Sequence, residues 1–563
     1  MRKIIICLIT LSIVLTCPIC IAENIKFEII GIEGDVKQNV ESILEASMVS
    51  LKTANESQLY DEAKQKITEA MQPFGYFKPR IRANRASQQP AVIRFFIKPG
   101  PVLLVTQVDF KLSGPGNNDA IFKKILANFP IQSNEVFSVV RYNNVKNQLE
   151  NAALQNGYFD AHFTQAAIKI DLQKYTAAII LHYDTGPRYK FGLLRFNDTS
   201  YSPQFLTRFT GFSFGEPYDT AKLQTFQENL ATADYFKTVT VDPKPNDAEN
   251  WLVPVDVFLS TLPRREYDLG LGYGTDTGPR AMVNYIARQL TSDGQMFKAQ
   301  IQASQISDNL QASYIIPGKN PATDKYIFGA AVQQIDISAG KSFLEKVSAS
   351  YMNSLWGLNQ IFSLTLQHER WALSGQPYQS ELLLVPSINW SKVYKDNQTR
   401  PTKGFRVNLG VLGSPALFDH NSFLQSKLSA KAIYPVFNIG RLIARMDLGY
   451  TYTQDITHVP LSFDFFAGGT ESIRGYGYNS IGPGTNLLAT SVEYRQKVKG
   501  DWYLATFFDA GNASNAFPGK LKKGVGIGPA WDSPVGVLEL TVARGLDEPG
   551  KSIMIQFSMG PDL

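Results

Sequence analysis

The sequence predicts a protein of two parts, in which three small α+β repeats of the order β-α-α-β-β precede a 16-stranded antiparallel transmembrane β-barrel. Three observations support this fold class. A helix-ending motif with Tyr-Phe recurs before Pro263. From Arg264 onward, apolar and polar residues alternate with the period of two that is typical of strands with two different faces. Glycine is unevenly distributed, since 11 of the 42 glycines fall in residues 1–263 and 31 in the last 300.

The N-terminus has the pattern of an export signal. Arg2 and Lys3 precede a mostly apolar run over 4–15, and the small residue Ala22 suits a cleavage site, so residues 1–22 are predicted to be a signal peptide. The alternatives are a membrane anchor, which needs about 20 apolar residues, and a lipoprotein signal. Such a leader predicts that the protein is exported from the cytoplasm.

Cysteine usage and charge exclude several classes of function. All three cysteines, Cys7, Cys17 and Cys20, lie in the predicted leader, so the mature chain would have no disulfide, thiolate metal site or cysteine nucleophile. The formal net charge of +5 is too balanced for a dedicated nucleic-acid binder. No nucleic-acid partner is expected.

The first part of the chain is a tandem repeat. The motif tyrosines Tyr76, Tyr158 and Tyr235 are 82 and 77 residues apart, a spacing that indicates repeated domains. Strands are expected after each motif, such as 79–85 and 91–98 in the first copy. Helices are expected before the motifs over 56–71, capped by Asn55 with Gln58, over 142–155, and over 221–233, capped by Asp219.

Proline and glycine mark the boundaries between the repeats. The joints are Pro99-Gly100-Pro101 and Gly186-Pro187. We therefore expect domains over 23–100, 101–187 and 188–263, followed by the barrel over 264–563.

The second part contains sixteen strand-like segments. They are 266–273, 281–289, 296–304, 309–316, 325–335, 344–353, 360–371, 381–391, 404–412, 423–434, 440–452, 486–496, 501–510, 524–531, 536–544 and 552–559. Their alternation predicts a polar inner and an apolar outer face, as in a transmembrane barrel. The connection 453–485 is the longest, whereas 392–403 is longer than a periplasmic turn usually is. A soluble β-sandwich is the alternative.

The longest connection carries the most informative motif. It contains Gly468-Gly469-Thr470-Glu471-Ser472-Ile473-Arg474-Gly475-Tyr476, and the motifs Ser491-Val492-Glu493-Tyr494, Phe508-Asp509-Ala510-Gly511 and Gly526-Ile527-Gly528-Pro529-Ala530-Trp531 follow in order. Here the chain resembles the outer-membrane insertase and translocase superfamily of BamA and TamA. The three repeats look like POTRA domains, and their number favours the TamA branch. The resemblance places the barrel in the outer membrane of a Gram-negative bacterium and the POTRA domains in the periplasm.

The resemblance also implies a role for the loop motif. In this family the loop folds into the barrel, so Arg474, Gly475 and Tyr476 are expected in the lumen, with Glu493 and Asp509 as the partners of the arginine. The physical reason is that a planar guanidinium in the lumen needs carboxylate acceptors. The alternative is a solvated charge at a loop tip.

Two functions remain open at this point. The resemblance implies an assembly or translocation factor for autotransporter-type and other β-barrel clients, with a TamB-like inner-membrane-anchored partner at the POTRA domains and a link to outer-membrane lipid. The alternative is a passive pore or transporter with a periplasmic docking stalk. An inward-folded loop favours the first, because it would plug a pore.

An insertase must expose a strand edge, and the seam between the first and last barrel strands is the one without a covalent turn. The expected lateral gate consists of Leu269, Gly270, Leu271, Gly272, Ile553, Ile555 and Phe557. The glycines weaken the first strand because they pack poorly.

Catalytic motifs are weak throughout the sequence. Residues 211–215 match Gly-x-Ser-x-Gly but lack the strand-turn-helix context of a hydrolase, and residues 339–342 are half a phosphate-binding loop. The five histidines, His162, His182, His368, His420 and His458, lack metal-ligand spacing. We expect no enzyme activity, catalytic residue, metal or cofactor.

Overall fold

The computed structural model describes residues 26–47, 56–88, 91–197, 199–276, 278–397, 400–417, 422–437, 439–534, 536–547 and 553–560. The predicted signal peptide and the Asn55 cap lie outside these residues. The chain divides into two compact units: Met1–Leu193 with Ser213–Ala221 and Pro243–Pro254, and Leu194–Phe212 with Lys222–Asp242 and Val255–Leu563.

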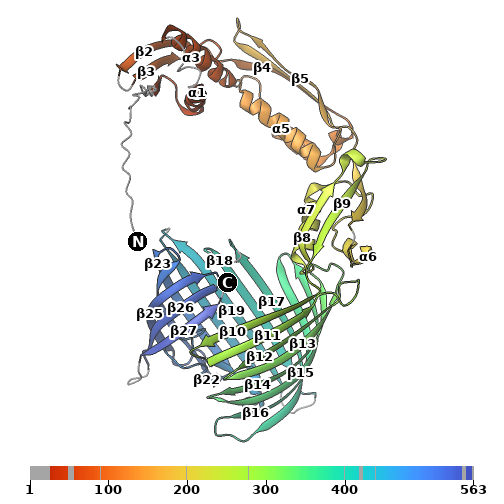
Figure 1. Cartoon of the computed structure of the whole chain (residues 1–563), viewed down its shortest axis with the longest axis vertical. Coiled ribbons are helices and arrows are strands. Elements are labelled where there is room, and N and C mark those ends of the chain that lie inside the picture. Colours follow the sequence, from red (N-terminus) through yellow and green to blue (C-terminus); the bar gives the residue numbers. More distant parts are fainter. Residues whose placement is uncertain are drawn as a thin grey trace, which may run out of the picture. The chain divides into compact units, whose positions relative to one another are not determined.

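Three small domains of the predicted order β-α-α-β-β occupy the first part of the chain (Figure 1). The first has β1 (Lys26–Ile30), α1 (Gly34–Ala46), α3 (Glu56–Met71), β2 (Arg80–Gln88) and β3 (Ala91–Lys98). The second has β4 (Leu104–Ser113), α4 (Ala120–Ala127), α5 (Val139–Gln155), β5 (His162–Asp171) and β6 (Thr176–Asp184). The third has β7 (Lys190–Phe196), α6 (Pro203–Thr207), α7 (Thr220–Thr232), β8 (Phe236–Pro243) and β9 (Leu252–Thr261).

The three domains share one sheet topology. The strand orders are β1-β3-β2, β4-β6-β5 and β7-β9-β8, so the last strand of each domain lies between the other two. The helices pack their apolar stripe on the sheet: Val145, Leu149 and Ala153 of α5 are buried in one cluster with Ile179 and Leu181 of β6. The predicted helix cap is present, since the backbone N–H of Ala221 donates to Asp219 Oδ1 over 2.8 Å.

The tyrosine motif follows a left-handed turn residue in every domain. Gly75 and Gly157 have φ of +89° and +80°, and Asp234 at the same place in the third domain has φ of +63°. The tyrosines that follow Gly157 and Asp234, Tyr158 and Tyr235, are buried. The repeat therefore comes from one structural unit, although its third copy lacks the glycine.

The second part of the chain forms one 16-stranded sheet in sequence order, apart from the two short loop strands β21 and β22. Its strands are β10 (Arg265–Gly274), β11 (Gly278–Ala287), β12 (Met296–Ser304), β13 (Ser307–Pro317), β14 (Lys325–Ile337), β15 (Gly340–Leu355), β16 (Leu358–Leu373), β17 (Gln379–Lys395), β18 (Gly404–Ser414), β19 (Phe423–Val436), β20 (Gly440–Thr453), β23 (Asn486–Lys499), β24 (Trp502–Ser514), β25 (Lys522–Ser533), β26 (Gly536–Gly545) and β27 (Met554–Gly560). This antiparallel barrel confirms the predicted fold class, and the β-sandwich alternative is wrong.

Several strands are longer than their alternation predicts. β15 and β16 have 16 residues each and β17 has 17. β15 begins four residues before the predicted segment 344–353, at Gly340-Lys341-Ser342-Phe343, which carries no apolar alternation although its backbone continues the ladder. β17 ends at Lys395, which shortens the connection expected at 392–403.

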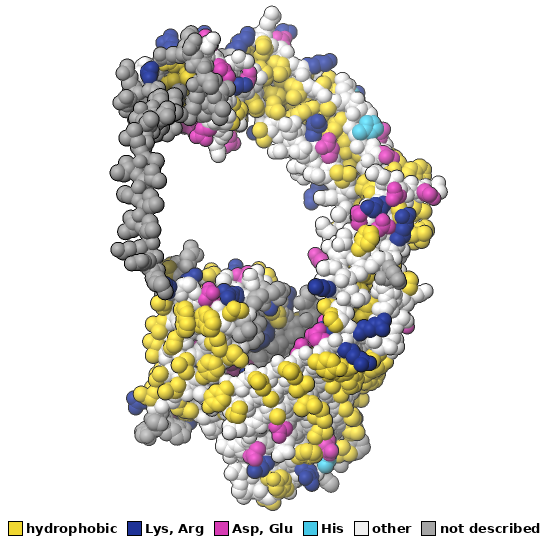
Figure 2. Space-filling view, in the orientation of Figure 1, with side chains coloured by type: hydrophobic (Ala, Val, Ile, Leu, Met, Phe, Trp, Pro, Cys, Tyr) yellow, Lys and Arg dark blue, Asp and Glu magenta, His cyan; other side chains and the backbone are white. Residues whose placement is uncertain are grey.

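The outer face of the barrel is apolar, and hydrophobic side chains gather over its strands (Figure 2). Leu269 and Leu271 are 81% and 86% exposed, as lipid-facing residues are when no bilayer is present. Among the described residues, no helix has both the length and the apolar content to cross a bilayer.

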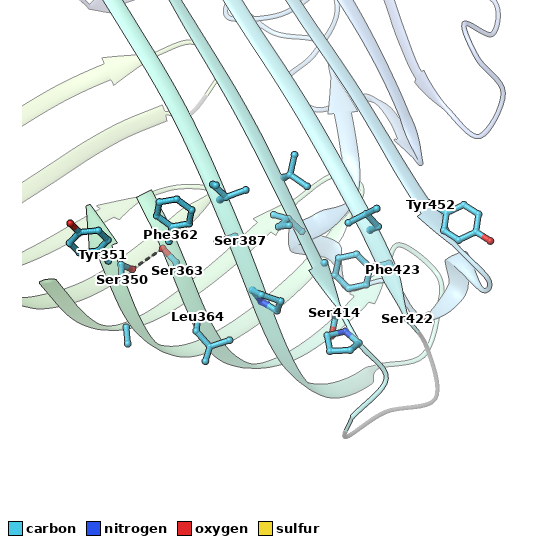
Figure 3. Close-up of a pocket in the computed structure, with 18 of the residues that line it drawn as sticks. Ser350, Tyr351, Phe362, Ser363, Leu364, Ser387, Ser414, Ser422, Phe423 and Tyr452 are labelled. Carbon is cyan, nitrogen blue, oxygen red and sulfur yellow. Dashed lines mark hydrogen bonds between the residues drawn. The ribbon is translucent and has the colours of Figure 1, made fainter. Parts of the chain in front are cut away.

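A hollow of about 1170 Å³ lies over β14–β20 (Figure 3). It is lined mainly by apolar and aromatic side chains, with a row of serines in which Ser350 Oγ donates to Ser363 Oγ over 2.8 Å. None of its described lining residues is charged, so it does not resemble a site for polar chemistry.

Candidate functional site: the luminal loop and the barrel seam

The loop between β20 and β23 is an ordered structure of its own. It contains two short 3₁₀ turns, Ile456–His458 and Leu461–Phe463, and a small antiparallel sheet of β21 (Phe465–Ala467) with β22 (Ile481–Gly484). The loop residues Phe465, Ala467, Ile473, Tyr476 and Ile481 form one buried cluster with Leu487, Ala489 and Ala513 of β23 and β24. The loop therefore packs against the barrel wall, and the alternative of a solvated loop tip is wrong.

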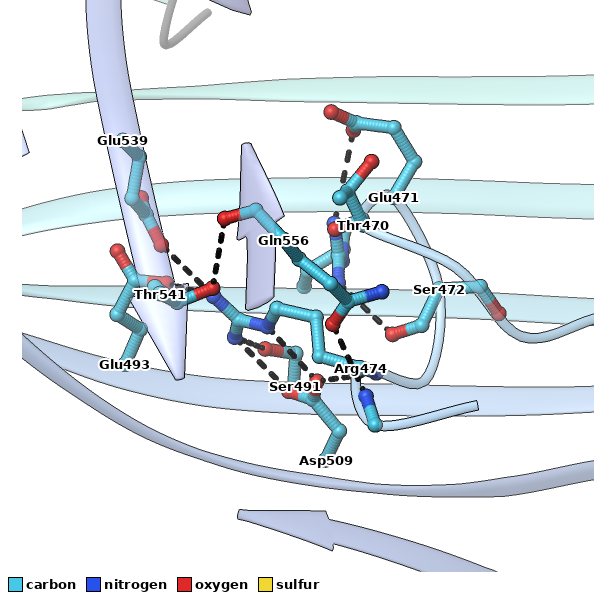
Figure 4. A network of polar contacts seen from close by, with 12 residues as sticks. Thr470, Glu471, Ser472, Arg474, Ser491, Glu493, Asp509, Glu539, Thr541 and Gln556 are labelled. Carbon is cyan, nitrogen blue, oxygen red and sulfur yellow. Dashed lines mark hydrogen bonds and ion pairs between the residues drawn. The ribbon is translucent and has the colours of Figure 1, made fainter. Parts of the chain in front are cut away.

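Arg474 is the centre of a buried polar network (Figure 4). Its Nε and Nη2 donate to Asp509 Oδ2 and Oδ1 over 2.8 and 2.9 Å, which is a bidentate pair. Its Nη1 donates to Glu493 Oε2 over 2.5 Å. The exposed fractions of Arg474, Glu493 and Asp509 are 5%, 5% and 0%. The structure thus brings together the arginine and both carboxylates that the family resemblance implied as its partners.

Three further residues belong to this network that the sequence analysis missed. Arg474 Nη1 also donates to Glu539 Oε1 over 3.2 Å, and Nη2 donates to Ser491 Oγ over 3.0 Å. Arg495 donates to Glu493 over 2.5 Å and to Glu539 over 2.8 Å. Strand parity could have found Arg495 and Ser491, because both lie two residues from Glu493 and share its face.

The network holds two guanidinium groups and three carboxylates, all of them buried. The Arg474 guanidinium also lies 3.3 Å from the centroid of the Phe507 ring, within the range of a cation–π contact. Removing one member of such a buried pair typically costs ~3–5 kcal/mol because it leaves an uncompensated charge behind. The network therefore locks the loop to the wall.

Gly475 and Tyr476 complete the contact of the loop with the last strands. The Gly475 N–H donates to Gln556 Oε1 of β27 over 3.0 Å, and Tyr476 Oη donates to the Lys523 carbonyl over 3.2 Å. Gly475 has φ of +86°, and a Cβ there would lie 2.5 Å from the carbonyl carbon of Arg544. Glycine is thus required by both the backbone conformation and the close approach.

Other loop residues form hydrogen bonds with parts of the barrel that are far apart in the sheet. The Thr470 N–H donates to Asp276 Oδ2, in the turn after β10, over 2.6 Å. Arg445 Nη2 of β20 donates to the Ser472 carbonyl over 2.9 Å. Ser462 Oγ donates to Glu369 of β16 over 2.5 Å. The loop consequently bridges regions that are far apart in the sheet.

The two ends of the 16-stranded sheet are β10 and β27, and no ladder pairs them within the described residues. The Phe557 N–H donates to Thr275 Oγ1 over 3.1 Å. An antiparallel register continued from this contact sets Tyr273 opposite Met559. The periplasmic half of β10 then extends past the described end of β27.

This register affects the predicted gate residues differently. Phe557 lies at the seam contact itself. In this extrapolated register Ile553 and Ile555 lie beyond the end of β10 at Gly274, and therefore not opposite Leu269 and Leu271. Gly270 and Gly272 lie on the inner face, where a Cβ at Gly272 would contact the Arg280 side chain. The sequence could not give this register, because it depends on the closure of the barrel.

The serine and histidines considered as candidate catalytic or metal-binding residues do not form a common site among the described residues. No group of three or more potential metal ligands is present in the described part of the chain. Ser213 lies in a loop, where its N–H donates to Glu216 over 2.9 Å. His182 and His368 contact single carboxylates, Asp109 over 3.0 Å and Glu345 over 3.2 Å.

Comparison with known proteins gives the family. A model of the Omp85 superfamily domain matches residues 269–562, and a model described as POTRA domain TamA domain 1 matches residues 26–99. The outer membrane protein assembly factor BamA of Nitratidesulfovibrio vulgaris is 22% identical over 95% of this chain and 72% of its own length.

Solved structures share the fold. BamA from Haemophilus ducreyi lacking POTRA domains 1–3 aligns with a TM-score of 0.64 at 16% identity, covering 81% of this chain and 99% of the other. CdiB from Escherichia coli aligns with a TM-score of 0.51 at 13% identity, covering 94% and 99%. The chain belongs to the Omp85 superfamily and is an outer-membrane β-barrel with periplasmic POTRA domains that acts in the assembly or secretion of outer-membrane proteins.

Proposed function

We propose that this protein assembles autotransporter-type and other β-barrel clients by lateral opening between β10 and β27, without catalysing a covalent reaction. A TamB-like inner-membrane-anchored partner binds its POTRA domains. Outer-membrane lipid contacts the barrel face around the opening. The TamA-type match of the first domain supports the choice of partner.

The observation that carries the proposal is the missing ladder between the two end strands, within the described residues. Each ladder hydrogen bond contributes only ~0.5–1.5 kcal/mol net, so a seam with few bonds opens at a low free-energy cost. On the side away from β11, the periplasmic half of β10 has no ladder partner among the described residues, so its N–H and C=O groups could pair with an incoming client strand. The luminal loop supports assembly over passive conduction because it packs inside the barrel, where it would obstruct a pore.

The test is to close the seam with a disulfide. In a chain without residues 1–22, which carry all three native cysteines, Tyr273→Cys would be combined with Met559→Cys. The matched control is Leu424→Cys with Tyr452→Cys, which are register partners on β19 and β20 with outward-facing side chains. Assembly of an autotransporter by reconstituted protein would be measured before and after reduction.

We expect the seam disulfide to abolish assembly until reductant is added, while the control disulfide has no effect. Full assembly with an efficiently formed seam disulfide would exclude lateral opening. Steady ion conductance of the unmodified barrel together with that result would favour the passive pore.

The partner is tested at the first domain. Ile30 and Phe96 are register partners on β1 and β3 and are each 42% exposed, which gives this sheet an apolar surface patch. A photo-crosslinking residue at Phe96 should capture an inner-membrane-anchored protein in intact cells, whereas one at Lys66 of α3 should not. Equal capture from both positions would argue against specific binding at this patch.

A further inference from the structure

The turn between α7 and β8 in the third POTRA domain differs from its two counterparts. They have Gly75 and Gly157 in the left-handed region, whereas this turn has Asp234 with φ of +63°. A residue with a Cβ is disfavoured in this conformation. Aspartate adopts this conformation more readily than most residues, and it offers a carboxylate that a glycine lacks.

Asp234 gains contacts with two cations of the barrel. Its Oδ1 accepts from Arg288 Nη2 over 3.3 Å and from Nε over 3.4 Å. Its Oδ2 accepts from Lys298 Nζ over 3.2 Å. Arg288 follows the end of β11 and Lys298 lies on β12, so the carboxylate of a POTRA turn contacts the base of the first barrel strands.

Arg288 extends this contact to the end strand β10. Its Nη1 donates to Glu266 Oε2 over 2.6 Å, and its backbone N–H donates to the Arg264 carbonyl over 2.9 Å. The Arg288 side chain is 5% exposed and Asp234 is 40% exposed, so salt screens this ion pair less than it screens a fully exposed one. One guanidinium thus joins Asp234 to the periplasmic end of β10.

The next residue of the motif fixes the same barrel turn. Tyr235 is 1% exposed and its Oη donates to the Gly294 carbonyl over 2.8 Å. Burial raises the pKa of Tyr235, so the hydroxyl keeps its proton for this bond. Arg208, at the end of α6, donates to the Pro317 carbonyl over 2.7 Å. The POTRA turn is held against the barrel base independently of the Asp234 ion pairs.

We propose that Asp234 is a positioning residue that acts through Arg288 to hold the periplasmic end of β10 in place. This end of β10 is the unpaired half of the seam, so β11 and the Arg288 contact are what restrain it within the described residues. Loss of the Asp234 carboxylate loosens the strand edge that receives clients. This consequence for assembly rests on the proposed function, whereas the effect on β10 does not.

The test is backbone hydrogen exchange in the full chain reconstituted in lipid nanodiscs. Asp234→Gly introduces the residue that its counterparts have, so the turn itself should fold at least as well. Asp234→Asn keeps the shape and removes the charge, and Asp234→Glu restores the charge. The control Glu28→Ala removes the Glu28–Arg94 ion pair of the first domain, whose side chains are 38% and 39% exposed.

We expect amides of residues 265–269 to exchange up to roughly fivefold faster in Asp234→Gly and Asp234→Asn, which is the upper end of the effect of losing a partly exposed ion pair. Asp234→Glu should restore most of the protection, and Glu28→Ala should leave β10 unchanged. Glu266→Gln by itself should also speed exchange of these amides, because Glu266 is the β10 residue that Arg288 contacts.

Faster exchange confined to residues 230–240 would show a merely local role and overturn the proposal. Unchanged exchange throughout would do the same. Hydrogen exchange is measured without clients, so it tests the positioning role separately from the proposed function. If β10 exchanged faster but the seam disulfide did not affect assembly, the positioning role of Asp234 would hold and lateral opening would be excluded. If β10 exchange were unchanged but the seam disulfide blocked assembly, only the positioning role of Asp234 would be excluded.

Discussion

Asp509 accepts three hydrogen bonds from Arg474, two from the guanidinium over 2.8 and 2.9 Å and one from the backbone N–H over 2.9 Å. The third bond ties the main chain of the luminal loop to the same carboxylate that neutralises the side chain. Loop conformation and charge compensation therefore depend on each other. A substitution at either residue should therefore affect both the position of the loop and the balance of charge in the network.

Arg474→Ala should destabilise the barrel by about 3–5 kcal/mol, because it leaves three buried carboxylates with Arg495 as their cation in the network. The measurement is the temperature at which the folded band is lost in heat-modifiability gels. Arg400→Ala is the control, since its ion pair with Asp501 over 2.8 Å is exposed and such pairs contribute ~0–1 kcal/mol. Equal behaviour of the two variants would contradict the role of Arg474 as a lock.

Asp509→Asn should be more damaging than Glu539→Gln. Both changes leave two guanidinium groups with two carboxylates, but Asp509 accepts the bidentate pair and the backbone N–H of Arg474, whereas Glu539 accepts a single bond from Arg474. We expect a loss of ~2–3 kcal/mol for Asp509→Asn and about 1 kcal/mol or less for Glu539→Gln. The same gel assay compares them, and the reverse order would show that Glu539 is the principal partner of Arg474.

Gly475→Ala should displace the loop from the last strands. Its φ of +86° and the 2.5 Å approach of a Cβ to Arg544 both oppose a side chain. Gly357→Ala is matched in backbone conformation, with φ of +70°, but has nothing within 4 Å of its Cβ. Gly357→Ala should cost about 1–2 kcal/mol. A protease that cleaves an accessible loop should cut 454–485 faster in Gly475→Ala alone, and equal cutting of both variants would contradict the close-approach argument.

A fragment of residues 24–263 should fold without detergent, because each small domain has its own sheet and its helices pack on that sheet. Its third domain should melt below the other two, since the fragment lacks the Gly294 carbonyl that accepts from Tyr235. Circular dichroism with thermal melting tests both points. An unfolded fragment would place the domain boundary elsewhere.

The sequence by itself determined the repeats and the strand order. Strand alternation and helix-ending motifs are local patterns, so the helix over 56–71 and the strands over 91–98 and 296–304 match the structure residue for residue. The pairing of Arg474 with Asp509 came from the resemblance of motifs. Strand ends were less predictable, because in β15–β17 the ladder continues where the apolar period stops.

The tertiary structure decided which side chains meet. Parity places Glu539 on an inner face, but only the path of the loop brings it to Arg474, 65 residues away. The contact of Asp234 with Arg288 and the seam register from Thr275 to Phe557 likewise join distant segments. The alternation of a strand has a period of two residues, so a short stretch of sequence is enough to predict it. An ion pair between distant segments depends instead on how the barrel closes and on the path of the loop inside it.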